Sequence, residues 1–209
     1  MYPPERIVCL TEETTETLYL LGEQDRIVGI SGYTVRPPQA RKEKPRVSAF
    51  ISADMPKILA LEPDLVLTFS DLQADLVAAL VRAGVTVHAF NQRTVAEILD
   101  MIRMLGALVG AQDRAMALAD RLAANVEDTR RRTSGAGPRP KVYFEEWDEP
   151  MISGIAWVSE LVEAAGGADI FPERAPCKSA RDRIVTADDV IRRAPDIVIG
   201  SWCGKKFKS

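Results

Sequence analysis

Cysteine, histidine and aromatic residues are scarce in this chain of 209 residues, which has three cysteines, one histidine and 6% aromatic residues. Cys9, Cys177 and Cys203 are too widely spaced for a disulfide framework or a CxxC zinc site. No apolar run approaches the roughly 18 residues that a membrane helix needs, so we expect a water-soluble protein. The 27 Lys and Arg residues face 30 Asp and Glu residues, and the net charge of −3 argues against nucleic acid as a partner.

Apolar residues make up 46% of the chain, which suits one large domain or two small ones. Short β-branched runs alternate with helical periodicity in the N-terminal part, and residues 32–46 form a Pro-rich, basic stretch that we expect to be a loop. Expected strands are residues 6–10, 27–30, 65–69 and 85–90, and expected helices are residues 13–21, 55–61 and 71–83. Strands separated by single helices predict an α/β fold with a parallel sheet covered on both faces.

Residues 95–132 carry no strand signal, and we expect Gly106 and Gly110 to divide them into two helices. The second helix, residues 112–132, has apolar residues at the three- and four-residue spacing of one buried stripe. At 1.5 Å per residue such a helix spans roughly 30 Å, the width of a small domain. The pattern predicts a spine helix that joins two lobes.

The C-terminal part of the sequence echoes the N-terminal part. Residues 16–22 resemble residues 160–166, and residues 58–67 resemble residues 190–199 in the same order. The alternative explanation is that both are generic helix-turn-strand units of any α/β protein. We interpret the repeat as two α/β lobes with parallel sheets, at 1–92 and 140–209, joined by a helical linker at 93–132 that includes the spine helix.

The two copies of the repeat do not end alike. The first copy is followed by a further helix and strand, whereas the second is followed only by residues 200–209. An apolar strand at residues 197–199 would then lie at a sheet edge, where it invites pairing with another chain. We therefore expect a second lobe that is incomplete at its C-terminus, either because the chain is truncated or because a homodimer covers the edge.

Several stretches resemble one known family in their order and spacing. They are RIVCL at 6–10, VGISGY at 28–33, RPPQA at 36–40, VSAF at 47–50, ILALEPDLV at 58–66 and AGGADIF at 165–171. The sequence resembles the helix-backbone class of substrate-binding proteins of ABC importers, which capture vitamin B12 and iron–siderophore complexes. The likeness is strongest to the vitamin B12-binding members.

The resemblance implies a non-catalytic solute-binding protein that holds a cobalamin-like metal chelate in a cleft between two lobes, for ABC-type import. The family presents an acidic residue on each lobe to the permease; Asp188 matches this position, but its counterpart in the first lobe is Pro56. Importer-associated members carry a signal peptide, whereas residues 1–6 lead directly into an expected strand without an apolar signal region. We therefore expect a cytoplasmic protein, or a periplasmic one if a signal peptide has been removed.

Aromatic residues recur at the carboxyl ends of the expected strands, where ligands of parallel sheets bind. By the resemblance, Tyr33 and Phe50 occupy positions at which vitamin B12-binding members stack rings on the ligand. The other candidate ligand-binding residues come from strand ends alone and are Phe69, Ser70, Glu145, Trp147 and Trp202. Stacking rings would grip a flat, largely apolar macrocycle, while a few polar groups would fix its edges.

Charged residues near these strand ends allow two interpretations. Glu145, Glu146, Asp148 and Glu149 surround Trp147, either as hydrogen-bond acceptors for a ligand or as a solvated loop. Arg181 and Arg183 precede an expected helix; they could contact an anionic ligand edge, but such residues usually lie on the surface.

An enzyme is the alternative from another class, because Cys9 and His88 both lie near strand ends and could form a nucleophile–base pair. No G-x-S-x-G, G-x-x-x-x-G-K-[ST] or G-x-G-x-x-G motif is present to support it. The same two residues with Cys203 could hold zinc, although scattered single ligands are weak signals. We expect no catalytic residue, resident cofactor or structural metal. An iron–siderophore-binding protein, or a cytosolic enzyme or chaperone acting on a metal chelate, remains an alternative.

Overall fold

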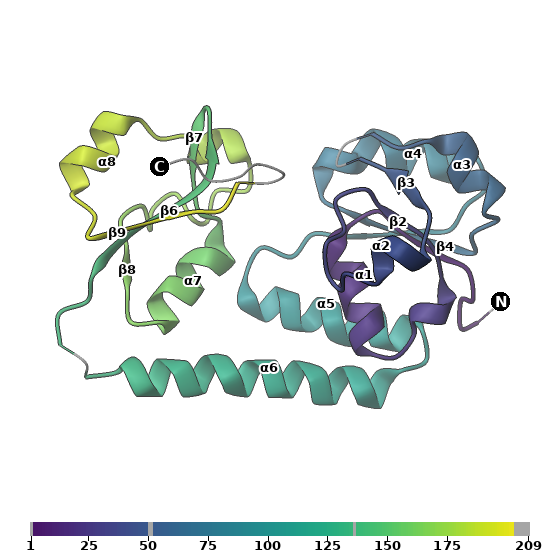
Figure 1. Cartoon of the computed structure of the whole chain (residues 1–209), viewed down its shortest axis with the longest axis horizontal. Helices are drawn as coiled ribbons and strands as arrows, with labels where there is room; N and C mark the ends of the chain where they lie inside the picture. Colours follow the sequence, from purple (N-terminus) through teal and green to yellow (C-terminus); the bar gives the residue numbers. More distant parts are fainter. Residues whose placement is uncertain (1, 50–51, 136, 203–209) are drawn as a thin grey trace. The chain divides into compact units, whose positions relative to one another are not determined.

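The computed structural model describes residues 2–49, 52–135 and 137–202. Its contacts divide the chain into two compact units (Figure 1). Unit 1 consists of Met1–Asn91 with Asp100–Ala119, and unit 2 consists of Gln92–Leu99 with Asp120–Ser209. The domain boundaries expected from the sequence, 1–92, 93–132 and 140–209, stay a prediction, and each unit is described by itself.

Unit 1 is built on a five-stranded sheet in the order β3-β2-β1-β4-β5. Every neighbouring pair is parallel, as the alternation of strands and helices predicts. The strands are β1 (Ile7–Cys9), β2 (Ile27–Ser31), β3 (Arg46–Ser48), β4 (Leu65–Phe69) and β5 (Val87–Phe90). The central strands β1 and β4 are almost wholly buried because helices cover both faces of the sheet.

Successive side chains of the central strands in unit 1 point to opposite faces of the sheet, and helices pack against both faces. Val8 and Val66 point to the face covered by α3 (Met55–Ala60) and α4 (Ala74–Arg82). Cys9 points the other way, toward α1 (Glu12–Leu20), which lies on the opposite side of the sheet in Figure 1. The remaining short helices of this unit are η1 (Gln24–Arg26), α2 (Ala40–Glu43) and η2 (Asp71–Gln73).

The stretch 32–46 differs from the loop expected there, because it contains α2 and leads into the short strand β3. The Gly32 backbone N–H donates to the Ser48 carbonyl at 2.7 Å, which ties the end of β2 to β3. A Cβ at Gly32 would lie only 2.7 Å from that carbonyl oxygen, so glycine permits the close approach. Three residues with one apolar side chain are too short a run to predict a strand.

Two helices, α5 (Val95–Leu108) and α6 (Gln112–Thr133), account for the strandless central stretch. Gly110, in the left-handed region at φ +72°, separates them as expected. Gly106 does not, because it lies inside α5, where a Cβ would come within 2.1 Å of the Ala115 Cβ on α6. In the described parts of the chain, no helix is both long and apolar enough to span a membrane.

The sheet of unit 2 is organised around β6 (Lys141–Asp148). This strand pairs in parallel with β8 (Ala168–Asp169) and β9 (Ile197–Gly200). It also pairs antiparallel with β7 (Met151–Ser153), so this sheet is mixed where the sequence predicted a parallel one. The antiparallel arm was missed because β7 has three residues and follows β6 through a two-residue turn.

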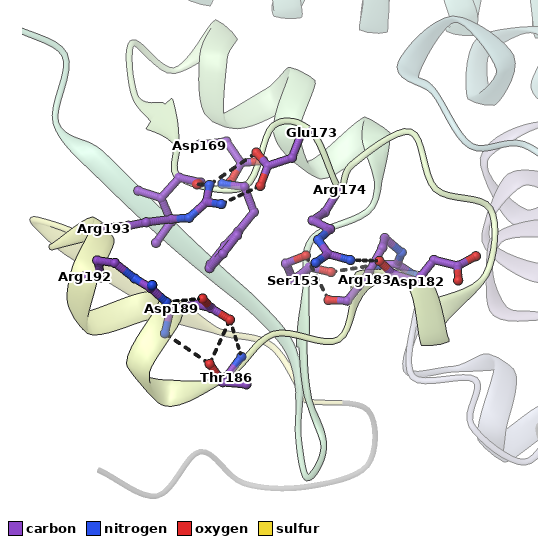
Figure 2. Close-up of polar contacts among 12 residues, drawn as sticks. Ser153, Asp169, Glu173, Arg174, Asp182, Arg183, Thr186, Asp189, Arg192 and Arg193 are labelled. Carbon is purple, nitrogen blue, oxygen red and sulfur yellow. Dashed lines mark hydrogen bonds and ion pairs between the residues drawn. The ribbon is translucent and has the colours of Figure 1, made fainter.

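Helices lie on both faces of this second sheet. On one face, Tyr143 packs with Phe171, Val185 and α8 (Ala187–Arg193). On the other face lies α7 (Ala156–Ala164), and the short helix η3 (Ala180–Arg183) precedes α8. Thr186 and Asp189 form a reciprocal capping box that starts α8 (Figure 2).

A groove of about 340 Å³ lies between α7 and the sheet of unit 2. Its lining is apolar and includes Val142, Phe144, Leu161, Ile197 and Ile199. Among the described strands, β9 pairs with β6 only, and its side chains are largely exposed. An incomplete second lobe and a homodimer through it both stay predictions.

Candidate functional site

The carboxyl ends of β1, β2 and β4 meet at one edge of the unit 1 sheet because the strands are parallel. At this edge the Ser31 hydroxyl donates to a Glu12 carboxylate oxygen at 2.7 Å and accepts from the Tyr33 backbone N–H at 3.1 Å. These bonds fix the backbone of Tyr33, while its side chain stays 41% exposed. The arrangement presents an accessible phenol ring on an anchored loop.

Phe69 and Ser70 lie at the same edge, where β4 ends. The Phe69 side chain is half-buried, and its backbone N–H donates to the Gln73 side-chain oxygen at 3.0 Å. Ser70 is buried at φ +55°, and its hydroxyl accepts from the Leu72 backbone N–H at 3.3 Å. The hydroxyl of Ser70 thus shapes the turn into α4. Phe50, the other ring predicted in this lobe, lies outside the described residues.

In unit 2, Glu145 lies within β6, opposite Gly200 at the carboxyl end of β9, and is only 9% exposed. Because β6 extends beyond Trp147, both Glu145 and Trp147 lie inside the strand and not after its end, where the sequence had suggested them. One carboxylate oxygen accepts from the Tyr143 hydroxyl at 3.0 Å, and the other accepts from the Trp202 indole N–H at 2.9 Å. The structure thus brings together two of the predicted residues, Glu145 and Trp202. Sequence reasoning missed Tyr143, although its place two residues before Glu145 on the same strand face was an available signal.

Trp147, the remaining predicted ring, is half-buried, and its indole N–H donates to the Glu149 carbonyl at 2.9 Å. Arg183, expected on the surface, is 2% exposed; it forms an ion pair with Glu146 and donates to the Ser153 carbonyl at 2.7 Å. Figure 2 shows Arg183 beside Ser153. Arg183 therefore holds the β6–β7 arm, and the arm carries Trp147.

Asp188, the candidate contact to a permease, lies in the first turn of α8 and is exposed. Its neighbour Asp189 is engaged instead, because it caps the helix and pairs with Arg192 (Figure 2). Pro56 stands in the first turn of α3, at the corresponding helix start of unit 1. The geometry leaves Asp188 accessible to a partner, and its docking role stays a prediction.

The hypothesis of a Cys9–His88 pair is wrong on geometric grounds. Cys9 aligns with Leu67 on β4, and Leu67 aligns with His88 on β5, so two strand spacings, about 10 Å, separate the two backbones. Burial raises the pKa of the Cys9 thiol to about 12, and burial lowers the pKa of His88. Cys203 lies outside the described residues, among which no three His, Cys, Asp or Glu side chains cluster to hold a metal ion.

Comparison with known proteins gives consistent matches. The profile of the family described as "Periplasmic binding protein" matches residues 7–209. A curated vitamin B12-binding protein of Vibrio cholerae serotype O1 is 31% identical over 176 residues. The aligned region is 82% of this chain and 63% of that protein, so the chain spans less than two thirds of the relative's length.

Solved structures show the same fold. The periplasmic vitamin B12-binding protein BtuF of Vibrio cholerae superposes with a TM-score of 0.78 at 26% identity, covering 95% of this chain and 77% of that one. A periplasmic heme-binding protein from Pseudomonas aeruginosa reaches 0.82 at 19% identity, covering 97% and 74%, and supports the fold alone. These matches confirm the resemblance seen in the sequence motifs, and this chain belongs to the periplasmic binding protein family.

Proposed function

We propose that this protein captures a corrinoid, a cobalamin-like metal chelate, for ABC-type import and performs no catalysis. The observation that carries the proposal is the 31% identity to a vitamin B12-binding protein across 82% of this chain. The strand-end rings support it, because a corrinoid has a broad, flat macrocycle on which aromatic side chains stack. No enzymatic alternative has comparable support, since Cys9 is buried, protonated and remote from His88.

The ligand contacts proposed in unit 1 are made by Tyr33 and Phe69 at the anchored strand edge. Those proposed in unit 2 are made by Trp147 and Trp202 at the ends of β6 and β9. These rings are exposed or half-buried, so each keeps surface for a ligand. Ser70 is buried, and we assign it a supporting role through the Leu72 backbone N–H.

Isothermal titration calorimetry with cyanocobalamin tests this function, with a ferric hydroxamate as the siderophore arm. We expect saturable binding of cyanocobalamin and much weaker binding of the hydroxamate. Removing one stacking ring, as in Tyr33→Ala, should weaken cyanocobalamin binding about tenfold, because ring stacking contributes on the order of 1 kcal/mol beyond area burial. Val35→Ala is the matched control, since Val35 is an exposed apolar residue near the same strand end.

A reversal of the two affinities would favour the iron–siderophore alternative. Binding of neither compound would contradict the whole proposal. Steady conversion of either compound, lost in Cys9→Ala, would instead favour the enzyme.

The proposed partner is an ABC permease, and the family description favours the periplasm over the cytoplasm as the place where they meet. Asp188 is the candidate contact on unit 2, because it is an exposed carboxylate beside the Asp189 helix cap. Asp188→Ala should reduce cobalamin uptake in cells severalfold while leaving ligand affinity unchanged. Asp182→Ala, a second exposed carboxylate of unit 2, is the control and should leave uptake unchanged. Equal uptake by wild type and Asp188→Ala would refute the docking role.

A further inference from the structure

Glu145 has a buried carboxylate, and each of its two oxygens accepts a hydrogen bond. Tyr143 donates its hydroxyl to one oxygen at 3.0 Å, and Trp202 donates its indole N–H to the other at 2.9 Å. The Glu145 carbonyl also accepts from the Ser201 backbone N–H at 2.9 Å. Two bonds from consecutive residues therefore tie the segment after β9 to Glu145 within β6, one through the backbone and one through the indole.

The support beneath Glu145 is rigid. The Tyr143 side chain is 1% exposed, and its ring meets Phe171 edge-on at 5.8 Å between centroids. The Arg193 guanidinium lies 4.3 Å from the centre of the Phe171 ring and pairs with Glu173 at 2.6 Å (Figure 2). Because each of these groups is held by the next, the carboxylate of Glu145 has little freedom to turn toward a ligand.

The protonation of Tyr143 suits this arrangement. Burial raises the pKa of the Tyr143 phenol, and the neighbouring Glu145 carboxylate raises it further. Tyr143 therefore stays a donor throughout the physiological range. With one hydrogen-bond donor on each oxygen, the hydrogen bonds of the Glu145 carboxylate offset the free-energy cost of burying it.

Trp202 lies beyond the carboxyl end of β9, the part of a parallel sheet at which ligands bind. An indole has a single hydrogen-bond donor, so an acceptor beneath it fixes how the ring is turned. A ring that is already oriented loses less conformational entropy when a ligand stacks on it. The hydrogen bond to Glu145 thus preorganises the half-buried Trp202 ring for stacking.

We propose that Glu145 is a positioning residue of the ligand site, which orients the Trp202 indole for stacking on the flat macrocycle and does not itself contact the ligand. The inference rests on the proposed function for its ligand, but the orientation of Trp202 is testable without one. It refines the expectation that Glu145 accepts hydrogen bonds from the ligand. Three variants separate these roles: Glu145→Gln, Glu145→Ala and Trp202→Phe.

The first arm follows Trp202 in the unliganded protein. Because the chain has three tryptophans, Trp147→Phe with Trp157→Phe leaves Trp202 as the single emitter. In that background Glu145→Ala should shift the emission to longer wavelength and increase quenching by acrylamide, since the freed indole turns toward water. Glu145→Gln keeps an acceptor oxygen and should shift the emission less. Glu149→Gln changes an exposed carboxylate in the turn after β6 and should leave the emission unchanged.

The second arm is a double-mutant cycle measured by calorimetry with cyanocobalamin, in the chain that retains Trp147 and Trp157. Glu145→Ala and Trp202→Phe should each weaken binding about tenfold, the scale of ordering one side chain on binding for the first and of losing stacking area for the second. The combined variant should be no weaker than Trp202→Phe alone, because Glu145 acts through the indole. Near-UV circular dichroism and thermal melting identify any variant that fails to fold, and Glu145→Gln then replaces Glu145→Ala in the cycle.

Additive losses in the cycle would overturn the inference in favour of a direct Glu145–ligand contact. Unchanged emission in Glu145→Ala would overturn it as well, and so would unchanged affinity in Trp202→Phe. If the wild-type chain binds neither cyanocobalamin nor a ferric hydroxamate, the proposed function fails. The emission arm then decides by itself whether Glu145 positions Trp202.

Discussion

Single carboxylates in this protein take their roles from their neighbours more than from their place in the sequence. Glu23 and Asp188 lie at the starts of helices, and Glu145 lies within the strand β6. Glu23 pairs with two arginines, Glu145 is buried between an indole and a phenol, and Asp188 is exposed. The sequence identified Glu145 and Asp188 as candidates, but the partners that define what Glu145 does lie on other segments of the chain.

Glu23 provides a pH-dependent test at the residue scale. Its burial raises the pKa, but hydrogen bonds and charges from Arg26 and Arg114 outweigh that effect and hold the pKa of Glu23 below its usual 4.5. A lowered folded-state pKa contributes stability above the unfolded value, and this contribution is lost as the pH falls through the folded-state pKa. Glu23→Gln should therefore lower the free energy of unfolding by about 1 kcal/mol at pH 7, and by progressively less below pH 4.5.

Urea denaturation of wild type and Glu23→Gln across this pH range measures the difference. Glu163→Gln, which changes an exposed carboxylate of unit 2, is the control and should behave as wild type. A Glu23→Gln difference that grows toward low pH would contradict the linkage.

The elements of this protein were predictable where their apolar runs are long. The strands that became β1, β2, β4 and β9 were expected within a residue or two, because each lies in a short, mainly apolar run that contains β-branched residues. The short strands β3 and β7 were missed, since three residues of mixed polarity carry no period. Gly106 was interpreted as a helix break because the packing that favours glycine there lies on another helix.

Gly106 supplies the test at this scale. A Cβ at this position would lie 2.1 Å from the Ala115 Cβ, so Gly106→Ala must push α5 and α6 apart in unit 1. We expect the free energy of unfolding to fall by about 2 kcal/mol, as in an overpacked core. Helix propensity alone predicts the opposite, a gain of up to about 1 kcal/mol.

Chemical denaturation of Gly106→Ala shows whether the substitution lowers or raises the free energy of unfolding. The double variant Gly106→Ala with Ala115→Gly is the matched control, because it restores the number of methyl groups at the contact. It should recover part of the lost stability. A Gly106→Ala protein more stable than wild type would show that the helix contact does not require glycine.

For the molecule as a whole, the α/β class and the family were readable from the sequence. The ordered motifs carried the family assignment, and the profile match over residues 7–209 confirms it. The ligand could not be predicted to the same degree from the sequence. The aromatic side chains that would select it are few, and the residues that hold them lie on distant segments of the chain. Tyr33 and Trp202 show this, since a serine–carboxylate pair anchors one and a buried carboxylate holds the other.

The claim that the ligand is a corrinoid is tested most directly by competition in equilibrium dialysis. The wild-type chain is dialysed against cyanocobalamin and a ferric hydroxamate at equal concentration, and the bound compound is identified by its visible absorbance. We predict that the protein retains cyanocobalamin, that excess hydroxamate does not displace it, and that Tyr33→Ala retains less. Retention of the hydroxamate in preference to cyanocobalamin, or of neither compound, would contradict the account.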